Sequence, residues 1–261
     1  MNTEDCVNKE LKCGLQEGEP ESGSDSASAG NSNGHHHTDE CYVYKYDCGK
    51  EVHKHTAECF SDKSADIETA QVWEKDLPKE LTGNYAKDLA AVAKSQVGYA
   101  ESTKNFEADR IDENNYNLRG YTRYGAWSGE DFAYTDEWSS LFAAFCLYYA
   151  GVPENDTLSN IGAAAMLEKW NSKGLYLAGD ADSVDPKVGD VVFLSKEKSG
   201  PAEKTGIVTE VNTDAKTFKV VIGNDDGQVK EVEFPTDSKY EILGFGRLPA
   251  QETAPAEKTD E

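Results

Sequence analysis

Residues 191–245 decide the fold, and they read VVFLSKEKSGPAEKTGIVTEVNTDAKTFKVVIGNDDGQVKEVEFPTDSKYEILGF. Short runs of β-branched and aromatic residues alternate there with glycine, with an Asp-Asp-Gly sequence and with proline. This alternation is typical of short strands joined by tight turns. We therefore predict five antiparallel strands, over residues 191–195, 207–211, 218–222, 229–234 and 242–245.

Three helical patterns precede these strands. Asn84 is suited to cap a helix that ends near Val97, since Leu89 and Val92 share one face. A second helix is predicted from Thr135 or Asp136 to the glycine and proline at 151–153, and a third from residue 159 to residue 170. Helices followed by an antiparallel sheet predict an α+β fold.

The charge of the chain excludes several classes of partner. Asp and Glu number 49 against 26 Lys and Arg, giving a formal charge of −23. No basic stripe interrupts this charge, so binding to a phosphate backbone is electrostatically opposed and we expect no nucleic acid partner. The longest apolar run, residues 141–150, is far shorter than the roughly 20 residues of a spanning helix, so we expect no membrane insertion.

The first 60 residues contain a repeated Cys/His pattern. Its complete copy has the spacing C-x4-H-x-H-x3-C and contains Cys48, His53, His55 and Cys59. A second copy is split by a Gly/Ser/Glu-rich insert at residues 18–34, which we expect to be disordered. Its ligands are taken from both sides of the insert: Cys13, His35, His37 and Cys41.

Two thiolates and two imidazoles in each copy suit tetrahedral Zn²⁺. A segment with so few large apolar side chains needs a metal or a disulfide to fold, so we predict two structural zinc sites. Disulfides remain open as an alternative, because six cysteines in a secreted chain ordinarily form bridges. The matched histidines favour zinc.

These features predict a modular chain. We expect Cys/His repeats over residues 1–60, a linker over 61–81, a globular domain over 82–249 and a disordered tail or linker over 250–261. The first residues do not resemble a secretion signal, and the first repeat begins inside its pattern. We therefore expect a fragment of a longer secreted or cell-surface protein, with further domains in the same polypeptide.

Five motifs in the globular domain resemble the CHAP family, the cysteine, histidine-dependent amidohydrolases/peptidases of bacterial cell walls. They are AVAKSQVGY (91–99), GYTRYGAW (120–127), PKVGDVVF (186–193), GIVTEV (206–211) and GN (223–224). The resemblance implies a papain-like α+β fold and cleavage of amide bonds in peptidoglycan. The Cys/His repeats likewise resemble modules beside such domains in surface proteins of Gram-positive bacteria.

The resemblance also implies a catalytic site that this chain has lost. The nucleophilic cysteine of the family falls on Ser139, its histidine on Lys204 and its orienting glutamate on Ile222, while Asn224 is retained. All five histidines precede residue 56, so the globular domain has no imidazole to serve as a general base.

We expect a degenerate, non-catalytic domain that binds or scaffolds peptidoglycan or a cell-wall peptide. Trp127, Trp138 and Asn224 would line its groove. One alternative is an amidase or peptidase that uses a Ser139–Lys204 dyad, which requires desolvation to deprotonate the lysine. Another is a structural spacer of a surface protein. Cys146, on an apolar helix face, is predicted to be a buried side chain without chemistry.

Overall fold

The computed structural model describes residues 7–11, 42–46, 56–112, 115–153, 162–197, 200–235 and 239–251. The chain forms two compact units, Met1–Ser61 and Asp62–Glu261. Within the described residues, no helix is both long enough and apolar enough to cross a membrane. The insert at 18–34, most of the Cys/His repeats and the tail from residue 252 onward lie outside the described residues.

The smaller unit contains one antiparallel pair of strands, β1 (Val7–Leu11) and β2 (Tyr42–Tyr46). Val7 pairs with Tyr46 and Leu11 pairs with Tyr42. A short 3₁₀ helix, η3 (Ala57–Phe60), follows and carries Cys59. Each strand directly follows a cysteine, β1 after Cys6 and β2 after Cys41.

The larger unit is built on a six-stranded sheet with the order β5-β10-β6-β7-β8-β9, in which all neighbours are antiparallel. The five strands predicted from the sequence are confirmed to within a few residues at each end. The sheet also contains a short edge strand, β5, that the pattern did not reveal. The strands are β5 (Tyr176–Ala178), β6 (Val191–Ser195), β7 (Lys204–Asn212), β8 (Thr217–Ile222), β9 (Lys230–Phe234) and β10 (Glu241–Gly246).

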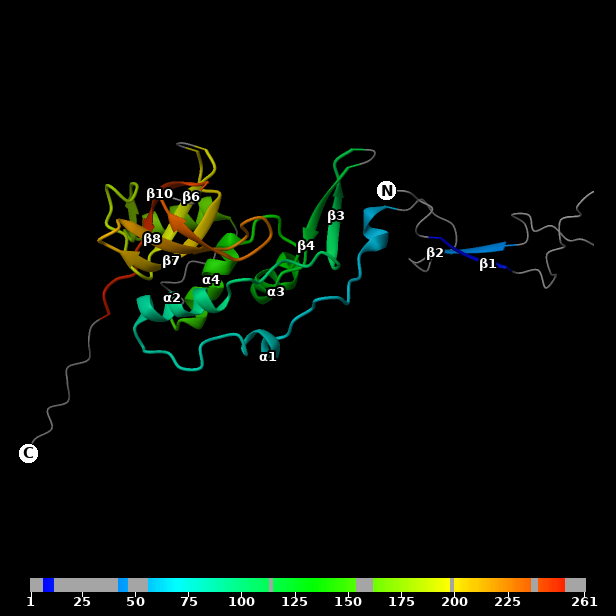
Figure 1. Cartoon of the computed structure of the whole chain (residues 1–261), viewed down its shortest axis with the longest axis horizontal. Coiled ribbons are helices and arrows are strands. Elements are labelled where there is room, and N and C mark those ends of the chain that lie inside the picture. Colours follow the sequence, from blue (N-terminus) through cyan, green and yellow to red (C-terminus); the bar gives the residue numbers. More distant parts are fainter. Residues whose placement is uncertain are drawn as a thin grey trace, which may run out of the picture. The chain divides into compact units, whose positions relative to one another are not determined.

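Helices α2 (Tyr85–Ser95) and α4 (Ser139–Tyr149) pack on β7 and on each other, and they lie along one side of the sheet (Figure 1). Asn84 caps α2 as predicted, because its side chain accepts a hydrogen bond from the backbone N–H of Lys87 at 3.0 Å. Every residue of α4 from Ser139 to Leu147 is buried. A helix that is apolar on all sides requires packing partners on all sides. The larger unit is therefore a mixed α+β structure arranged around α4.

The two faces of the sheet carry separate apolar clusters, because successive side chains of a strand point to opposite faces. Val191, Phe193, Ile207 and Val221 pack with α4. Their neighbours Val192, Leu194, Val208, Val220 and Ile222 form a second cluster on the opposite face, together with Phe218, Phe234 and Phe245.

The segment that we expected as a linker over residues 61–81 packs into the larger unit from Asp62 onward. Its short helix α1 (Ala70–Trp73) places the Trp73 ring against Phe145 of α4, and the indole N–H donates to the Tyr149 hydroxyl at 2.8 Å. Arg123 binds the same segment through Glu68 and Asp76. The few apolar side chains of this segment are enough to hold it on the larger unit, because α4 offers them an apolar surface.

The remaining elements border α4 and the sheet. They are a hairpin of β3 (Phe106–Arg110) and β4 (Tyr116–Gly120), the helices α3 (Arg123–Ser128) and α5 (Ala163–Ser172), and the 3₁₀ helix η4 (Glu130–Phe132). The helix predicted to begin at Thr135 or Asp136 begins at Ser139. The helix predicted from residue 159 is described from Ala163, and residue 159 itself lies outside the described residues.

Replacement of Trp73 by alanine tests whether the 62–77 segment is part of the folded unit. We expect Trp73→Ala to lower the free energy of unfolding by about 3 kcal/mol, since a large buried ring and its hydrogen bond are lost. Val72 is 43% exposed, so Val72→Ala should change stability by less than about 0.5 kcal/mol. Urea unfolding followed by far-UV circular dichroism measures both. Equal effects would show that the segment does not pack in solution.

Candidate functional site

Ser139 stands at the first position of α4, and the start of β7 covers it. Its Oγ accepts a hydrogen bond from the Thr205 backbone N–H at 3.0 Å, and its carbonyl accepts one from the Thr205 hydroxyl at 2.7 Å. The residue has no exposed surface. Ser139 therefore joins α4 to β7, and its hydroxyl does not face an open cleft.

Lys204, the first residue of β7, is enclosed beside this junction. Its ammonium forms an ion pair with the Glu137 carboxylate and donates a second hydrogen bond to the Asn224 carbonyl at 2.6 Å. The other oxygen of Glu137 accepts from the Ser139 backbone N–H at 2.9 Å. Glu137 thus binds the positive end of α4 and the Lys204 ammonium together.

Asn224 follows β8 in a left-handed backbone conformation, with φ of +56°. Its side-chain amide donates to the Asp136 carbonyl at 2.8 Å, which ties the loop before α4 to the end of β8. Gly223 permits this approach, because a Cβ there would lie 2.7 Å from the Cβ of Phe142. The Gly-Asn pair brings the strand end against α4.

Ile222 is fully buried in the apolar cluster on the sheet face opposite α4. Its β7 partner in the ladder is Gly206. Val220, Phe218 and Phe234 are members of the same cluster. A carboxylate at this position would be desolvated without a partner, so the position has become part of the core.

The chemistry available at this site follows from these contacts. A charged ammonium that donates to a carboxylate and a carbonyl has no lone pair with which to accept a proton. Within the described residues, no hydrogen bond joins the Lys204 ammonium to the Ser139 hydroxyl. Ser139 and Lys204 therefore belong to one hydrogen-bond network, in which Glu137, Thr205 and Asn224 are their partners.

The two tryptophans predicted to line a groove are not brought together. Trp138 is fully buried, where it stacks on Tyr124 at 5.3 Å and donates to the Glu101 carboxylate at 2.9 Å. Trp127 packs against Phe145, with the two ring centroids 5.5 Å apart. Phe145 lies about 9 Å along α4 from Ser139, given the helical rise per residue. Of the three residues predicted to line the groove, Asn224 is the one that accepts a hydrogen bond from the Lys204 ammonium.

Cys146 is fully buried within α4, as the sequence predicted. Burial raises the pKa of its thiol well above the usual range. Since the thiolate is the nucleophile of cysteine chemistry, Cys146 does not replace the missing cysteine at the start of the helix.

Seven of the eight proposed zinc ligands, namely Cys13, His35, His37, Cys41, Cys48, His53 and His55, lie outside the described residues. Cys59 is described in η3, where its sulfur lies 3.9 Å from the Thr56 hydroxyl. In the part of the chain that is described, no group of three or more His, Cys, Asp or Glu side chains is arranged to hold a metal ion.

Sequence reasoning missed the residues that complete this network. Neither Glu137 nor Thr205 was predicted from the sequence. The sequence signal for Glu137 is that an acidic residue stands directly before Trp138 and Ser139 at a predicted helix start. In the same chain, Lys204 stands where the family resemblance places a histidine. Thr205 gave no signal, because its contact with Ser139 spans 66 residues of sequence.

No family model matches this sequence, and no curated protein matches it. The resemblance to the CHAP family therefore rests on the five motifs and their order alone.

The two side chains of the Glu137–Lys204 pair differ in exposure, so we expect their replacement to cost different amounts of stability. The Lys204 side chain is 6% exposed and the Glu137 side chain 33% exposed. Glu137→Gln leaves a buried ammonium without its counter-charge, so we expect it to cost about 3 kcal/mol of stability. Lys204→Met leaves a carboxylate that water still reaches, so we expect about 1 kcal/mol. Urea unfolding of both single variants and the double variant measures the coupling.

Glu210→Gln is the matched control, because Glu210 pairs with Lys219 on the same sheet while 50% exposed. We expect it to cost less than about 0.5 kcal/mol. Equal losses in Glu137→Gln and Lys204→Met would contradict the contrast in burial.

Proposed function

We propose that the larger unit is a papain-like, CHAP-related domain that has lost hydrolysis and serves as a binding or scaffolding module at the bacterial cell wall. The observation that carries the loss of hydrolysis is the capture of the Lys204 ammonium between the Glu137 carboxylate and the Asn224 carbonyl. A lysine held in this way stabilises the fold at the position where the family has its base.

The order of the elements supports the family assignment. The helix that begins at Ser139 packs against the strand that begins at Lys204, and Asn224 follows the neighbouring strand. In the CHAP family the nucleophile stands at a helix start and the base at a strand start. The spatial meeting of Ser139, Lys204 and Asn224 is what that arrangement requires, although their side chains are no longer suited to amide hydrolysis.

The amidase alternative requires Lys204 to become neutral and to reach the Ser139 hydroxyl. Both partners of the ammonium stabilise its charged form, and Ser139 is covered by Thr205. The spacer alternative is favoured by one observation, the burial of Trp138, because that ring offers no surface to a ligand. Binding to the wall therefore has to be measured directly.

Peptidoglycan sacculi and soluble muropeptides distinguish the three functions. We expect the full chain to co-sediment with sacculi and to release no new amino groups, since the site lacks a base. Ser139→Ala should behave identically. Hydrolysis that disappears in Ser139→Ala would establish the amidase and end this proposal. Absence of both hydrolysis and co-sedimentation would leave the spacer function and would equally overturn the binding role.

We also propose that the smaller unit is held by zinc, as a secreted or surface-exposed module of a longer polypeptide. The pairing of β1 with β2 supports this. Leu11 and Tyr42 are paired, and the chain between them begins and ends at the same end of the ladder. Cys13 and Cys41 are the second and the last residues of that intervening chain, and they belong to one proposed ligand set.

Metal analysis of the reduced full chain tests this proposal. We expect about two Zn²⁺ per chain, because each copy supplies two cysteines and two histidines. His53→Ala combined with His55→Ala should remove about one equivalent, while the neighbouring substitutions Lys54→Ala and Thr56→Ala should remove none. Zinc-free protein in which four of the five cysteines other than Cys146 are paired in disulfides would establish disulfides in its place.

A further inference from the structure

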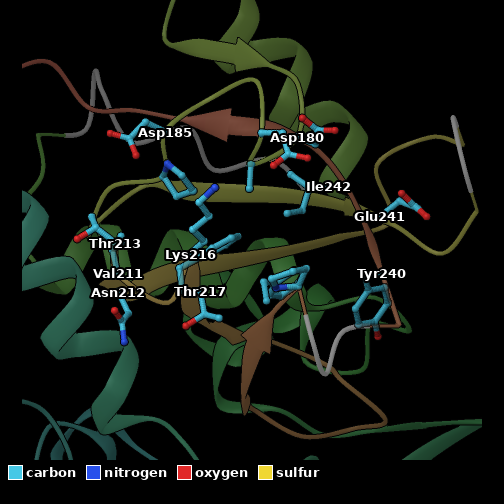
Figure 2. A pocket seen from close by; sticks show the side chains of 16 residues that line it. Asp180, Asp185, Val211, Asn212, Thr213, Lys216, Thr217, Tyr240, Glu241 and Ile242 are labelled. Carbon is cyan, nitrogen blue, oxygen red and sulfur yellow. The ribbon is translucent and has the colours of Figure 1, made fainter.

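A second site lies on the sheet face opposite α4, in a cavity of about 640 Å³. Three parts of the chain surround it: the 180–186 loop, the turn that joins β7 to β8, and the starts and ends of β8, β9 and β10. Figure 2 shows this cavity with its lining side chains. Its volume falls within the range of cavities that hold small ligands or a few side chains of a peptide.

The floor of the cavity is apolar, and its source is the second apolar cluster. Helices cover the sheet face toward α4. On the opposite face, the second apolar cluster is covered in part by a loop, which contributes the partly buried Ala181 and Val184. Side chains at the border of the cluster consequently remain partly exposed. Those that line the cavity are Val211, Ile242, Ala181, Pro186 and Pro235.

The rim of the cavity is acidic. Asp180, Asp182, Asp185 and Glu241 line it, and all four are exposed. Hydrogen bonds from the hydroxyl and backbone N–H of Ser183 lower the pKa of Asp180, so this carboxylate is charged at neutral pH. In the described part of the chain, the side chains of Asp182 and Glu241 form neither an ion pair nor a hydrogen bond. Their negative charge is therefore available to a ligand.

The arrangement of these charges restricts the ligand further. In Figure 2, Asp185 lies toward one end of the cavity and Glu241 toward the other, and the side chains of Lys216 and Ile242 lie between them. Lys216, in the turn before β8, is the one cationic side chain in the lining and makes no ion pair with described residues. A complementary ligand carries positive charge at both ends and an apolar group in the middle.

We propose that this cavity binds a basic peptide segment in which an apolar side chain is flanked by lysine or arginine. The apolar side chain packs on Val211 and Ile242, and the flanking cations lie beside the rim carboxylates. The site is independent of Ser139 and Lys204, because it opens on the other face of the sheet. It therefore stands whether or not the cell-wall function proposed above is correct.

Calorimetric titration of the full chain with the blocked peptide acetyl-Lys-Phe-Lys-amide tests the proposal. We expect saturable binding with a dissociation constant of about 1 mM or tighter. Acetyl-Lys-Gly-Lys-amide should bind about tenfold more weakly, since it lacks the apolar group. Acetyl-Glu-Phe-Glu-amide should not bind. Glycine and phenylalanine peptides of equal affinity would overturn the proposal, as would the absence of saturable binding.

Variants distinguish the cavity from the general acidity of the chain. Asp182→Asn with Glu241→Gln should weaken binding about three- to thirtyfold, because two exposed charge pairs are removed. Glu130→Gln with Asp131→Asn removes the same charge from exposed positions in η4 and should change affinity less than about twofold. Lys216→Gln should tighten binding about two- to fivefold by removing repulsion. Equal weakening by both double variants would show diffuse attraction and refute the site.

Discussion

The enclosure of α4 is the constraint on which the larger unit depends. Nine consecutive residues of this helix, from Ser139 to Leu147, are buried, so it needs an apolar surface on every side. The sheet supplies one side through Ile207 and Val221, and α2 and α3 supply others. Trp73, on a segment that looks like a linker in the sequence, contributes a further contact through Phe145. The same enclosure explains why the hydroxyls of Ser139 and Ser140 both accept hydrogen bonds, since an unpaired buried group there would cost stability.

The polar groups at the start of α4 are paired with residues from other parts of the chain. The first backbone N–H groups of a helix lack partners within the helix and attract negative charge. Glu137 binds the N–H of Ser139, and Lys204 neutralises Glu137 in turn. Thr205 donates hydrogen bonds to the hydroxyl and the carbonyl oxygen of Ser139. In a hydrolase of the papain-like type, this region must remain open and hold a base poised for proton transfer. Here the polar groups of Glu137, Ser139, Lys204 and Thr205 bind one another.

The two faces of the sheet have different neighbours, and this difference locates the second proposed site. Helices cover the face that contains Ile207, whereas the opposite face retains partly exposed residues such as Val211 and Ile242 at the border of its cluster. Ile222 illustrates the consequence at the level of one residue, because it belongs to that second cluster and is fully buried. A position that the family resemblance assigns to an orienting acid is thereby used for apolar packing.

The sequence by itself determined the α+β class, the five main strands, the cap at Asn84 and the burial of Cys146, because each depends on local patterning or local turn chemistry. Through motif resemblance it also predicted Ser139, Lys204 and Asn224 as residues of one site. Only the tertiary structure decided that Glu137 pairs with Lys204, that Thr205 covers Ser139 and that Trp138 and Trp127 lie in different surroundings. It alone decided that the 62–77 segment is part of the fold. Most of these outcomes depend on contacts between residues far apart in the sequence. The separation is 66 positions for Ser139 and Thr205, 67 for Glu137 and Lys204 and 76 for Trp73 and Tyr149, and no local pattern encodes such contacts.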